Sequence, residues 1–329
     1  MKYYLFLFLC IMMFTVNGQK QKPVPIIFDS DIGPDYDDVG AMALLHAFAD
    51  KGEAKILATI ACNKYPNAAP VLSVLNTYFK RPGIPVGISK GKAVSIADFQ
   101  HWSDTIVAKY PHAIHSNDEA ENAVKVYRRV LSKQPDKSVT IVTVGFLTNL
   151  AYLIKSKPDE YSGLSGMDLI KKKVRRLVSM AGKFPGENEF REFNVKIDSA
   201  ASQLVFTKWP TEVIYSGFEI GVKIKTGLPL VNNSAIKNSP VKDAFSICLP
   251  MARGDNNGRN SWDETAVLVA IKGQEPYYSL QPGTIIVNEN GSNSWDSKGK
   301  NQYYLVEKLP YEQVEKLIND LMQHEPGSR

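Results

Sequence analysis

Five aspartates lie within ten residues near the start of the chain: Asp29, Asp31, Asp35, Asp37 and Asp38. They follow the apolar run Ile26–Phe28 and precede a helical pattern that begins at Val39. Like charges at this density repel one another, so the segment predicts a hard cation held by oxygen ligands. It is not an EF-hand, because Gly33 takes the fifth position and Gly40 the twelfth. The alternative is a solvated acidic loop in which Asp37 or Asp38 caps the helix.

Polar residues also follow the later apolar runs. Asn63 ends one run, Glu192 and Asn194 come after another, and Asp263 opens an apolar helical pattern. Each has a plainer interpretation: Asn63 as a turn former, Glu192 as the ion-pair partner of Arg191 or a lysine, and Asp263 as a helix N-cap. Their shared place after predicted strands favours a common site.

Strands must position these residues, and short β-branched runs alternate with helical periodicity along the chain. The predicted strands are Pro25–Phe28, Lys55–Cys62, Val139–Val144, Leu177–Met180 and Glu212–Tyr215, and the helices are Val39–Lys51, Ala68–Lys80, Leu147–Ser156 and Ser199–Lys208. This order predicts an α/β fold, a mostly parallel Rossmann-like sheet covered by helices on both faces, with ligands at the carboxyl ends of its strands. Near the C-terminus, Thr284–Asn288, an Asn290-Gly291 turn and Tyr303–Glu307 predict a hairpin, followed by a helix at Tyr311–His324.

The acidic segment resembles the hallmark of the inosine-uridine nucleoside hydrolase family, Asp-x-Asp-Pro-Gly-x-Asp-Asp between a strand and a helix. The matching residues are Asp29, Asp31, Gly33, Asp37 and Asp38, with Ile32 in place of the proline and two extra residues before the Asp-Asp pair. The resemblance implies that Asp31 binds calcium and acts as general base. It also implies that Asp38 binds calcium and that Asp37 holds a ribose hydroxyl.

The resemblance extends over nearly the whole chain after residue 18. Cys62-Asn63 stands where the family has Gly-Asn, Gly145-Phe146-Leu147-Thr148-Asn149 is similar to Gly-x-Leu-Thr-Asn, and Glu192-Phe193-Asn194 with Asp198-Ser199-Ala200-Ala201 is similar to a further signature. By this likeness Asn63, Glu192 and Asn194 hold the ribose, Met180 lies against the sugar, and Asn188 takes the 5′-hydroxyl. The backbone carbonyl of Val144 and the carboxylate of Asp263 complete the calcium ligands. Thr148 is expected to cap the helix that it opens.

Trp262 stands where many family members have a histidine that protonates the leaving base. Tryptophan can stack on a base and donate one N–H, but it cannot act as a general acid. Arg253 and Arg259, in the polar segment before it, are candidate donors to the departing base. The alternative is that this segment is a flexible Gly/Asn-rich loop.

The family resemblance implies a hydrolase that cleaves the N-glycosidic bond of ribonucleosides with a calcium-bound water. Its partner would be a small nucleoside, and assembly into a dimer or tetramer is left open. One alternative is a non-catalytic exported nucleoside- or ribose-binding protein. Another is an Asp-x-Asp phosphatase, because the strand ending in Asp29-Ser30-Asp31 also resembles the first motif of haloacid-dehalogenase-like phosphatases.

Composition indicates a globular protein of one domain, residues 19–329, behind a signal peptide at 1–18. The chain has 329 residues, 44% of them hydrophobic, and its net charge of +5 is the balance of 39 basic and 34 acidic residues. Lys171–Arg176 is the only dense basic run and is expected to be a solvated helix end, so no nucleic-acid partner is expected. Lys2, the apolar stretch Tyr3–Val16 and Gly18 predict export to the periplasm or outside the cell, with no membrane anchor after cleavage. Cys62 and Cys248 then remain as one potential pair.

Overall fold

The computed structural model of the chain describes residues 22–186 and 189–327. The predicted signal peptide therefore lies outside the described residues. None of the helices in these two ranges is both long enough and apolar enough to span a bilayer.

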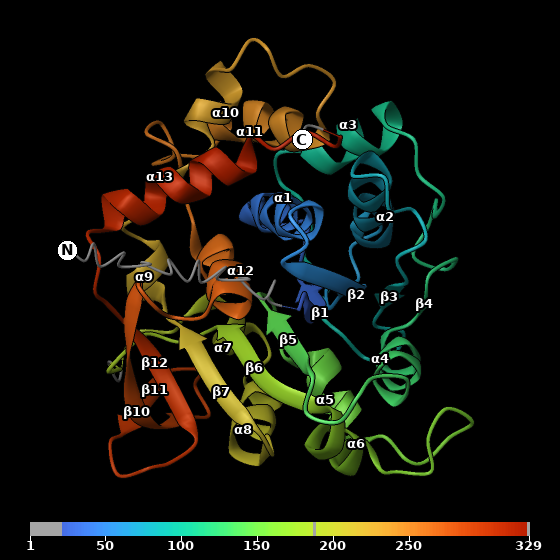
Figure 1. Cartoon of the computed structure of the whole chain (residues 1–329), viewed down its shortest axis with the longest axis vertical. Helices are drawn as coiled ribbons and strands as arrows, with labels where there is room; N and C mark the ends of the chain where they lie inside the picture. Colours follow the sequence, from blue (N-terminus) through green and yellow to red (C-terminus); the bar gives the residue numbers. More distant parts are fainter. Residues whose placement is uncertain (1–21, 187–188, 328–329) are drawn as a thin grey trace, which may run out of the picture.

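A ten-stranded sheet forms the centre of the molecule, in the order β11-β10-β12-β7-β6-β5-β1-β2-β3-β4 (Figure 1). Its strands are β1 (Val24–Ser30), β2 (Ala54–Ala61), β3 (Val86–Ile88), β4 (Glu121–Asn122), β5 (Val139–Thr143), β6 (Val174–Met180), β7 (Glu212–Ser216), β10 (Tyr278–Val287), β11 (Asn293–Asp296) and β12 (Gln302–Glu307). Every pairing from β12 across to β4 is parallel, and only β10 pairs antiparallel, with β11 and with β12. The predicted mostly parallel sheet is confirmed.

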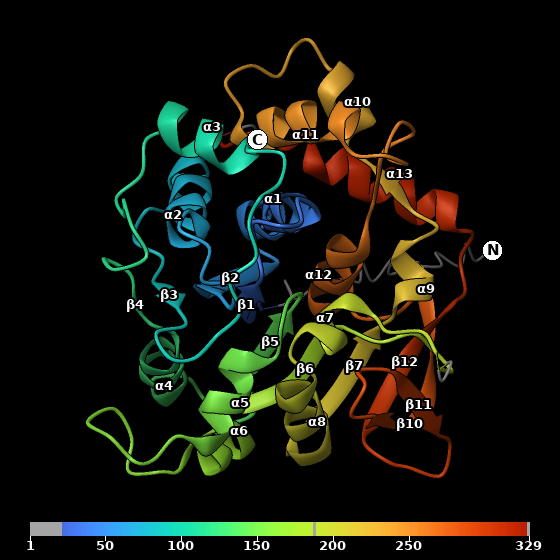
Figure 2. The same ribbon diagram turned by 180° about the vertical axis from the view of Figure 1, so that it is seen from behind.

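Helices cover both faces of this sheet, as the two opposite views show (Figures 1 and 2). They are α1 (Asp37–Asp50), α2 (Ala68–Tyr78), α3 (Trp102–Lys109), α4 (Ala123–Ser132), α5 (Thr148–Lys155), α6 (Gly166–Lys173), α7 (Phe193–Ile197), α8 (Ser199–Lys208), α9 (Phe218–Gly221), α10 (Leu228–Asn232), α11 (Pro240–Met251), α12 (Trp262–Lys272) and α13 (Tyr311–Met322). Residues of α1, α2 and α12 join the hydrophobic core on one face, and residues of α4, α5, α6 and α8 join the core on the other. A separate small ribbon joins β8 (Lys225–Thr226) to β9 (Arg259–Asn260).

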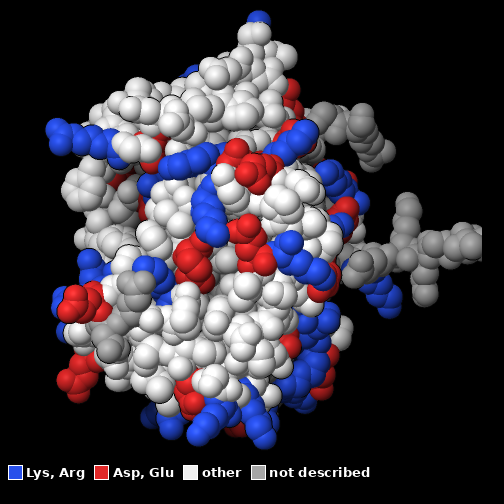
Figure 3. All heavy atoms as spheres, turned by 90° about the vertical axis from the view of Figure 1, so that its left-hand side faces the viewer, with Lys and Arg blue, Asp and Glu red and all other residues white. Residues whose placement is uncertain are grey.

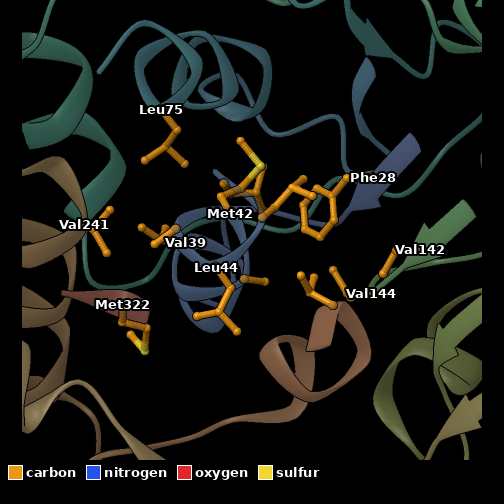
Figure 4. Packing of buried hydrophobic residues seen from close by; sticks show 14 of the residues in the cluster. Phe28, Val39, Met42, Leu44, Leu75, Val142, Val144, Val241 and Met322 are labelled. Atoms are coloured by element: carbon orange, nitrogen blue, oxygen red, sulfur yellow. The ribbon is translucent and has the colours of Figure 1, made fainter. Parts of the chain in front are cut away.

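Two hydrophobic cores lie on either side of the sheet. Along β1, Ile26 and Phe28 belong to one core and Ile27 to the other, because successive side chains of a strand point to opposite faces. Figure 4 shows the first core, with Phe28, Met42 and Val144 grouped around α1. Helix α1 is buried along almost its whole length, so it serves as the central rod of this half of the molecule.

The C-terminal strands differ in one respect from the sequence expectation. The Asn290-Gly291 turn joins β10 to β11, with Thr284–Val287 paired to Asn293–Asp296, and not to Tyr303–Glu307. The first half of β10 instead pairs with β12, which also continues the parallel sheet beside β7. One ten-residue strand thus serves two neighbours, a choice that local turn chemistry does not specify.

The basic run Lys171–Arg176 spans a junction. Lys171 to Lys173 form the last turn of α6, where positive charge complements the helix dipole, and the rest begins β6. On the face shown in Figure 3, acidic and basic side chains are interspersed. Cys62 and Cys248 are both buried free thiols, so the potential pair does not form a disulfide.

Candidate active site

The acidic segment leaves the sheet where the strand order reverses. Strands β2 to β4 lie on one side of β1 and β5 to β7 on the other, and such a switch point opens a crevice at the carboxyl ends of the strands. Gly145, just after β5, allows the two loops to touch. A Cβ atom there would lie 2.4 Å from the backbone nitrogen of Asp31 and 2.8 Å from the Sγ of Cys62. Because glycine has no side chain, the loop after β5 can lie directly against Asp31.

A pocket of about 250 Å³ opens at this crevice. Eight of the predicted site residues line it: Asp31, Asp37, Val144, Met180, Glu192, Asn194, Trp262 and Asp263. Asp38 is fully buried, and its charge acts on both Asp31 and Asp263. Asn188 lies outside the described residues, and Asn63 is placed beside the pocket and not in its wall. Residues from five chain segments thus meet in one pocket.

Buried carboxyl groups are concentrated at this pocket. Burial raises the pKa of Asp31 and Asp263 well above the usual range, and repulsion from Asp38 adds to the effect in both. Burial also raises the pKa of Asp38 to about 7. Among the described residues, Oδ2 of Asp31 and both carboxylate oxygens of Asp38 have no hydrogen-bond partner. Buried carboxylates without partners are costly, and an added cation would relieve that cost.

The described side chains do not yet form a closed metal cage. No group of three or more His, Cys, Asp or Glu side chains in the described ranges is arranged to hold an ion as it stands. The donor set at the site consists entirely of oxygens, which suits a hard cation such as Ca²⁺.

Glu192 and Asn194 build the sugar side of the pocket. The Glu192 carboxylate accepts hydrogen bonds from the backbone N–H groups of Gly182 (3.0 Å), Asn194 (2.9 Å) and Val195 (3.0 Å), and it caps α7. The amide of Asn194 donates to the carbonyl of Val144 at 3.0 Å. Glu192 therefore bonds to backbone N–H groups, and not to Arg191 as the alternative interpretation had it. These bonds hold the loops after β5 and β6 together at the predicted metal-binding carbonyl.

Asn63 braces the acidic loop. Its Nδ2 donates to the carbonyls of Asp31 (3.2 Å) and Ile96 (2.9 Å), and its Oδ1 accepts from the N–H groups of Ile96 (2.9 Å) and Tyr65 (3.3 Å). The side chain therefore ties the end of β2 to Asp31. Its predicted ribose contact stays a prediction.

Aromatic rings form the outer wall. The Trp262 ring stacks on Phe218 with centroids 5.4 Å apart, and Phe218 lies 4.7 Å from Phe190. The indole N–H of Trp262 donates to the carbonyl of Phe218 at 3.0 Å. Trp262 thus lines the pocket with its indole N–H already bonded.

Several buried residues next to the site make contacts that the sequence did not predict. Asp29 is fully buried, accepts hydrogen bonds from Tyr127 (2.8 Å) and Asn149 (3.2 Å), and has its pKa raised by burial to about 7. Thr148 does not cap α5 with its side chain; Leu147 holds that position, and the Thr148 hydroxyl donates to Asp198. The only sequence signal for this layer was the position of Asp29 and Asn149 within the matched motifs.

Comparison with known proteins agrees with this arrangement. Residues 26–309 match the family described as inosine-uridine preferring nucleoside hydrolase. A pyrimidine-specific ribonucleoside hydrolase of Shewanella sp. (strain ANA-3) is 30% identical over 241 residues, which cover 70% of this chain and 66% of that protein, just under two thirds.

Solved structures show the same fold. A plant nucleoside hydrolase superposes with a TM-score of 0.70 at 20% identity, covering 92% of this chain and 99% of that one. An inosine-uridine preferring nucleoside hydrolase from Bacillus anthracis gives a TM-score of 0.69 at 16% identity, covering 91% and 99%. With a family match that spans most of its length, the chain belongs to the inosine-uridine preferring nucleoside hydrolases.

Proposed function

We propose that the protein hydrolyses the N-glycosidic bond of ribonucleosides. The observation that carries the proposal is the pocket at the switch point of the sheet, which is lined both by buried aspartates, among them Asp31 with an oxygen unpartnered within the described residues, and by aromatic rings. Breaking this bond develops positive charge on the ribose ring, which a cluster of buried carboxylates stabilises. The aromatic wall suits a planar base.

Members of this family depend on a metal ion, and we propose that the ion is Ca²⁺. Asp31, Asp38, Asp263 and the carbonyl of Val144 would hold it, an all-oxygen set of the kind that calcium prefers. A bound Ca²⁺ lowers the pKa of a water molecule and orients it. The unpartnered oxygens of Asp31 and Asp38 support this assignment.

Asp31 is the proposed general base. Its Oδ2 has no partner among the described residues, and its carboxylate lines the pocket, so it can accept a proton from the attacking water. Asp37, Glu192 and Asn194 would fix the ribose hydroxyls, with Met180 against the sugar ring. Such positioning lowers the barrier by holding the sugar in a reactive orientation.

Assistance to the leaving base is the weakest part of the site. The N–H of Trp262 is already bonded to Phe218, so this residue has no free indole N–H to donate to the base. We expect Trp262→His to accelerate hydrolysis of inosine but not of a nitrophenyl riboside, whose leaving group needs no protonation. No change on either substrate would contradict the placement of the base against Trp262.

The deciding experiment is a panel of purine and pyrimidine ribosides and deoxyribosides, with calcium and with chelator, in which free base is measured by chromatography. Pyrimidines are included because the Shewanella relative is named for them. Release that needs calcium and a ribose supports the proposal. Tight ribose binding without base release would favour the second candidate function, a nucleoside- or ribose-binding protein. The occupied N–H of Trp262 is the observation that favours this candidate.

We also propose that the protein is exported, because Lys2 and the apolar stretch Tyr3–Val16 have the composition of a signal peptide. Detection of the mature chain outside the cytoplasm, with its first residue near position 19, is the test. A dimer or tetramer would be recognised by its mass in solution.

A further inference from the structure

Arg259 joins two carboxylates of the acidic segment. Its Nε and Nη2 donate to Oδ1 of Asp37 at 3.2 and 3.1 Å, and Nη2 also pairs with Asp35. Its Nη1 lies 3.6 Å from Asp255. The guanidinium fork is well suited to hold two carboxylates in a fixed relation.

The surroundings of Arg259 hold it in place. Its guanidinium lies 5.0 Å from the ring centre of Tyr36 and 5.1 Å from that of Trp262, and only 16% of its side chain is exposed. Its backbone pairs in the short ribbon of β8 and β9. Arg259 is therefore a rigid element between the acidic loop and α12, and not part of a flexible loop.

Arg259 makes its ion pairs in the acidic segment with Asp35 and Asp37. Its positive charge also acts on Asp31 and Asp263. Asp35 lies in the two-residue excess of the loop over the family motif, yet it lines the pocket beside Asp37. Arg259 thus supplies a positive charge that offsets the additional carboxylate of Asp35.

We propose that Arg259 positions Asp35 as an additional hydrogen-bond acceptor for the sugar hydroxyls. An ionised carboxylate only accepts hydrogen bonds, so it selects hydroxyl donors. This inference rests on the proposed function for the identity of the ligand as a ribose. It makes Asp35 a specificity residue and Arg259 a positioning residue.

The test compares Asp35→Asn and Arg259→Gln with the parent, using the full mature chain loaded with calcium. Asp255→Asn is the matched control, because it removes the same charge near the same guanidinium but lies outside the pocket wall, and its amide oxygen can still accept from Tyr36. Calorimetry measures the Kd of free ribose and the number of Ca²⁺ ions bound per chain. Steady-state kinetics with uridine and inosine separates KM from kcat.

We expect Asp35→Asn to raise the ribose Kd and KM by about fivefold to tenfold, because a charge-assisted hydrogen bond becomes a neutral one, with kcat nearly unchanged. Arg259→Gln should weaken ribose binding similarly, with the number of bound Ca²⁺ ions unchanged. Asp255→Asn should behave as the parent.

An unchanged ribose Kd in Asp35→Asn would overturn the inference, as would an equal loss in Asp255→Asn. If Arg259→Gln does not fold, the ribose Kd of Asp35→Asn still tests the inference. A parent that binds ribose but releases no base refutes the proposed function and leaves this inference standing. A parent that hydrolyses nucleosides while Asp35→Asn is unaltered refutes the inference alone, and a parent that binds no ribose refutes both.

Discussion

Gly145→Ala tests whether the contact between the loops after β1 and β5 creates the site. The added Cβ would lie 2.4 Å from the nitrogen of Asp31, about 1 Å inside an ordinary contact of roughly 3.5 Å. Because the clash is with backbone, the two loops must part by a comparable distance. Overpacking of this kind costs about 1–3 kcal/mol of unfolding free energy. A displacement of about 1 Å at a catalytic group lowers the rate on the order of a hundredfold.

The assay is kcat/KM for base release, with thermal melting of the same samples in calcium. Gly83→Ala is the control, because its Cβ would meet nothing within 4 Å. We expect Gly145→Ala to melt lower and to lose about a hundredfold in kcat/KM, while Gly83→Ala keeps the parent's activity. A Gly145→Ala protein with the parent's kcat/KM would refute the argument that this close approach positions Asp31.

Three further outcomes are expected. Asp31→Asn should lower base release by about 10²–10⁴-fold while the circular dichroism spectrum stays that of the parent, and retained activity would exclude Asp31 as general base. Burial, with Arg81 nearby, lowers the pKa of His46 to about 3 from the ordinary 6.5. As the pH falls, the unfolded chain therefore binds a proton on His46 before the folded chain does. The contribution of neutral His46 to the unfolding free energy is complete above pH 6.5 and falls as the pH drops toward 3, with about 2 kcal/mol lost at pH 5. Denaturant titrations at several pH values should show this loss of unfolding free energy in the parent and not in His46→Gln. An equal dependence of the unfolding free energy on pH in the two proteins would contradict the prediction. Reducing agent should leave the melting temperature unchanged because Cys62 and Cys248 are free thiols, and a fall on reduction would reveal a disulfide.

Local patterns in the sequence were enough to predict the central strands β1, β2, β5, β6 and β7 and the helices α1, α2, α5, α8 and α13 with approximate limits, but not several of the elements between them. The apolar run before Asp29 is β1, and the helical pattern after Asp38 is α1. Alternation of strands and helices predicted a parallel sheet, because each crossover helix must pack back on the strands it joins. The order of elements along the chain was therefore sufficient to assign the polar residues at strand ends to one edge of the sheet.

Tertiary packing decided which residues meet. Arg259 reaches Asp37 across 222 positions in the chain, and no periodicity near either residue indicates that contact. The two neighbours of β10 and the failure of Cys62 to pair with Cys248 likewise depend on where whole elements lie.

The same distinction holds inside the site. Residue types and spacing alone determined that carboxyl groups would gather after β1, because the five aspartates follow the strand directly. Only the tertiary structure assigned Asn63 to bracing Asp31 and paired Asp35 with Arg259. Hydrogen bonds and ion pairs depend on distances of a few tenths of an ångström, and those distances arise from the packing of elements far apart in the chain.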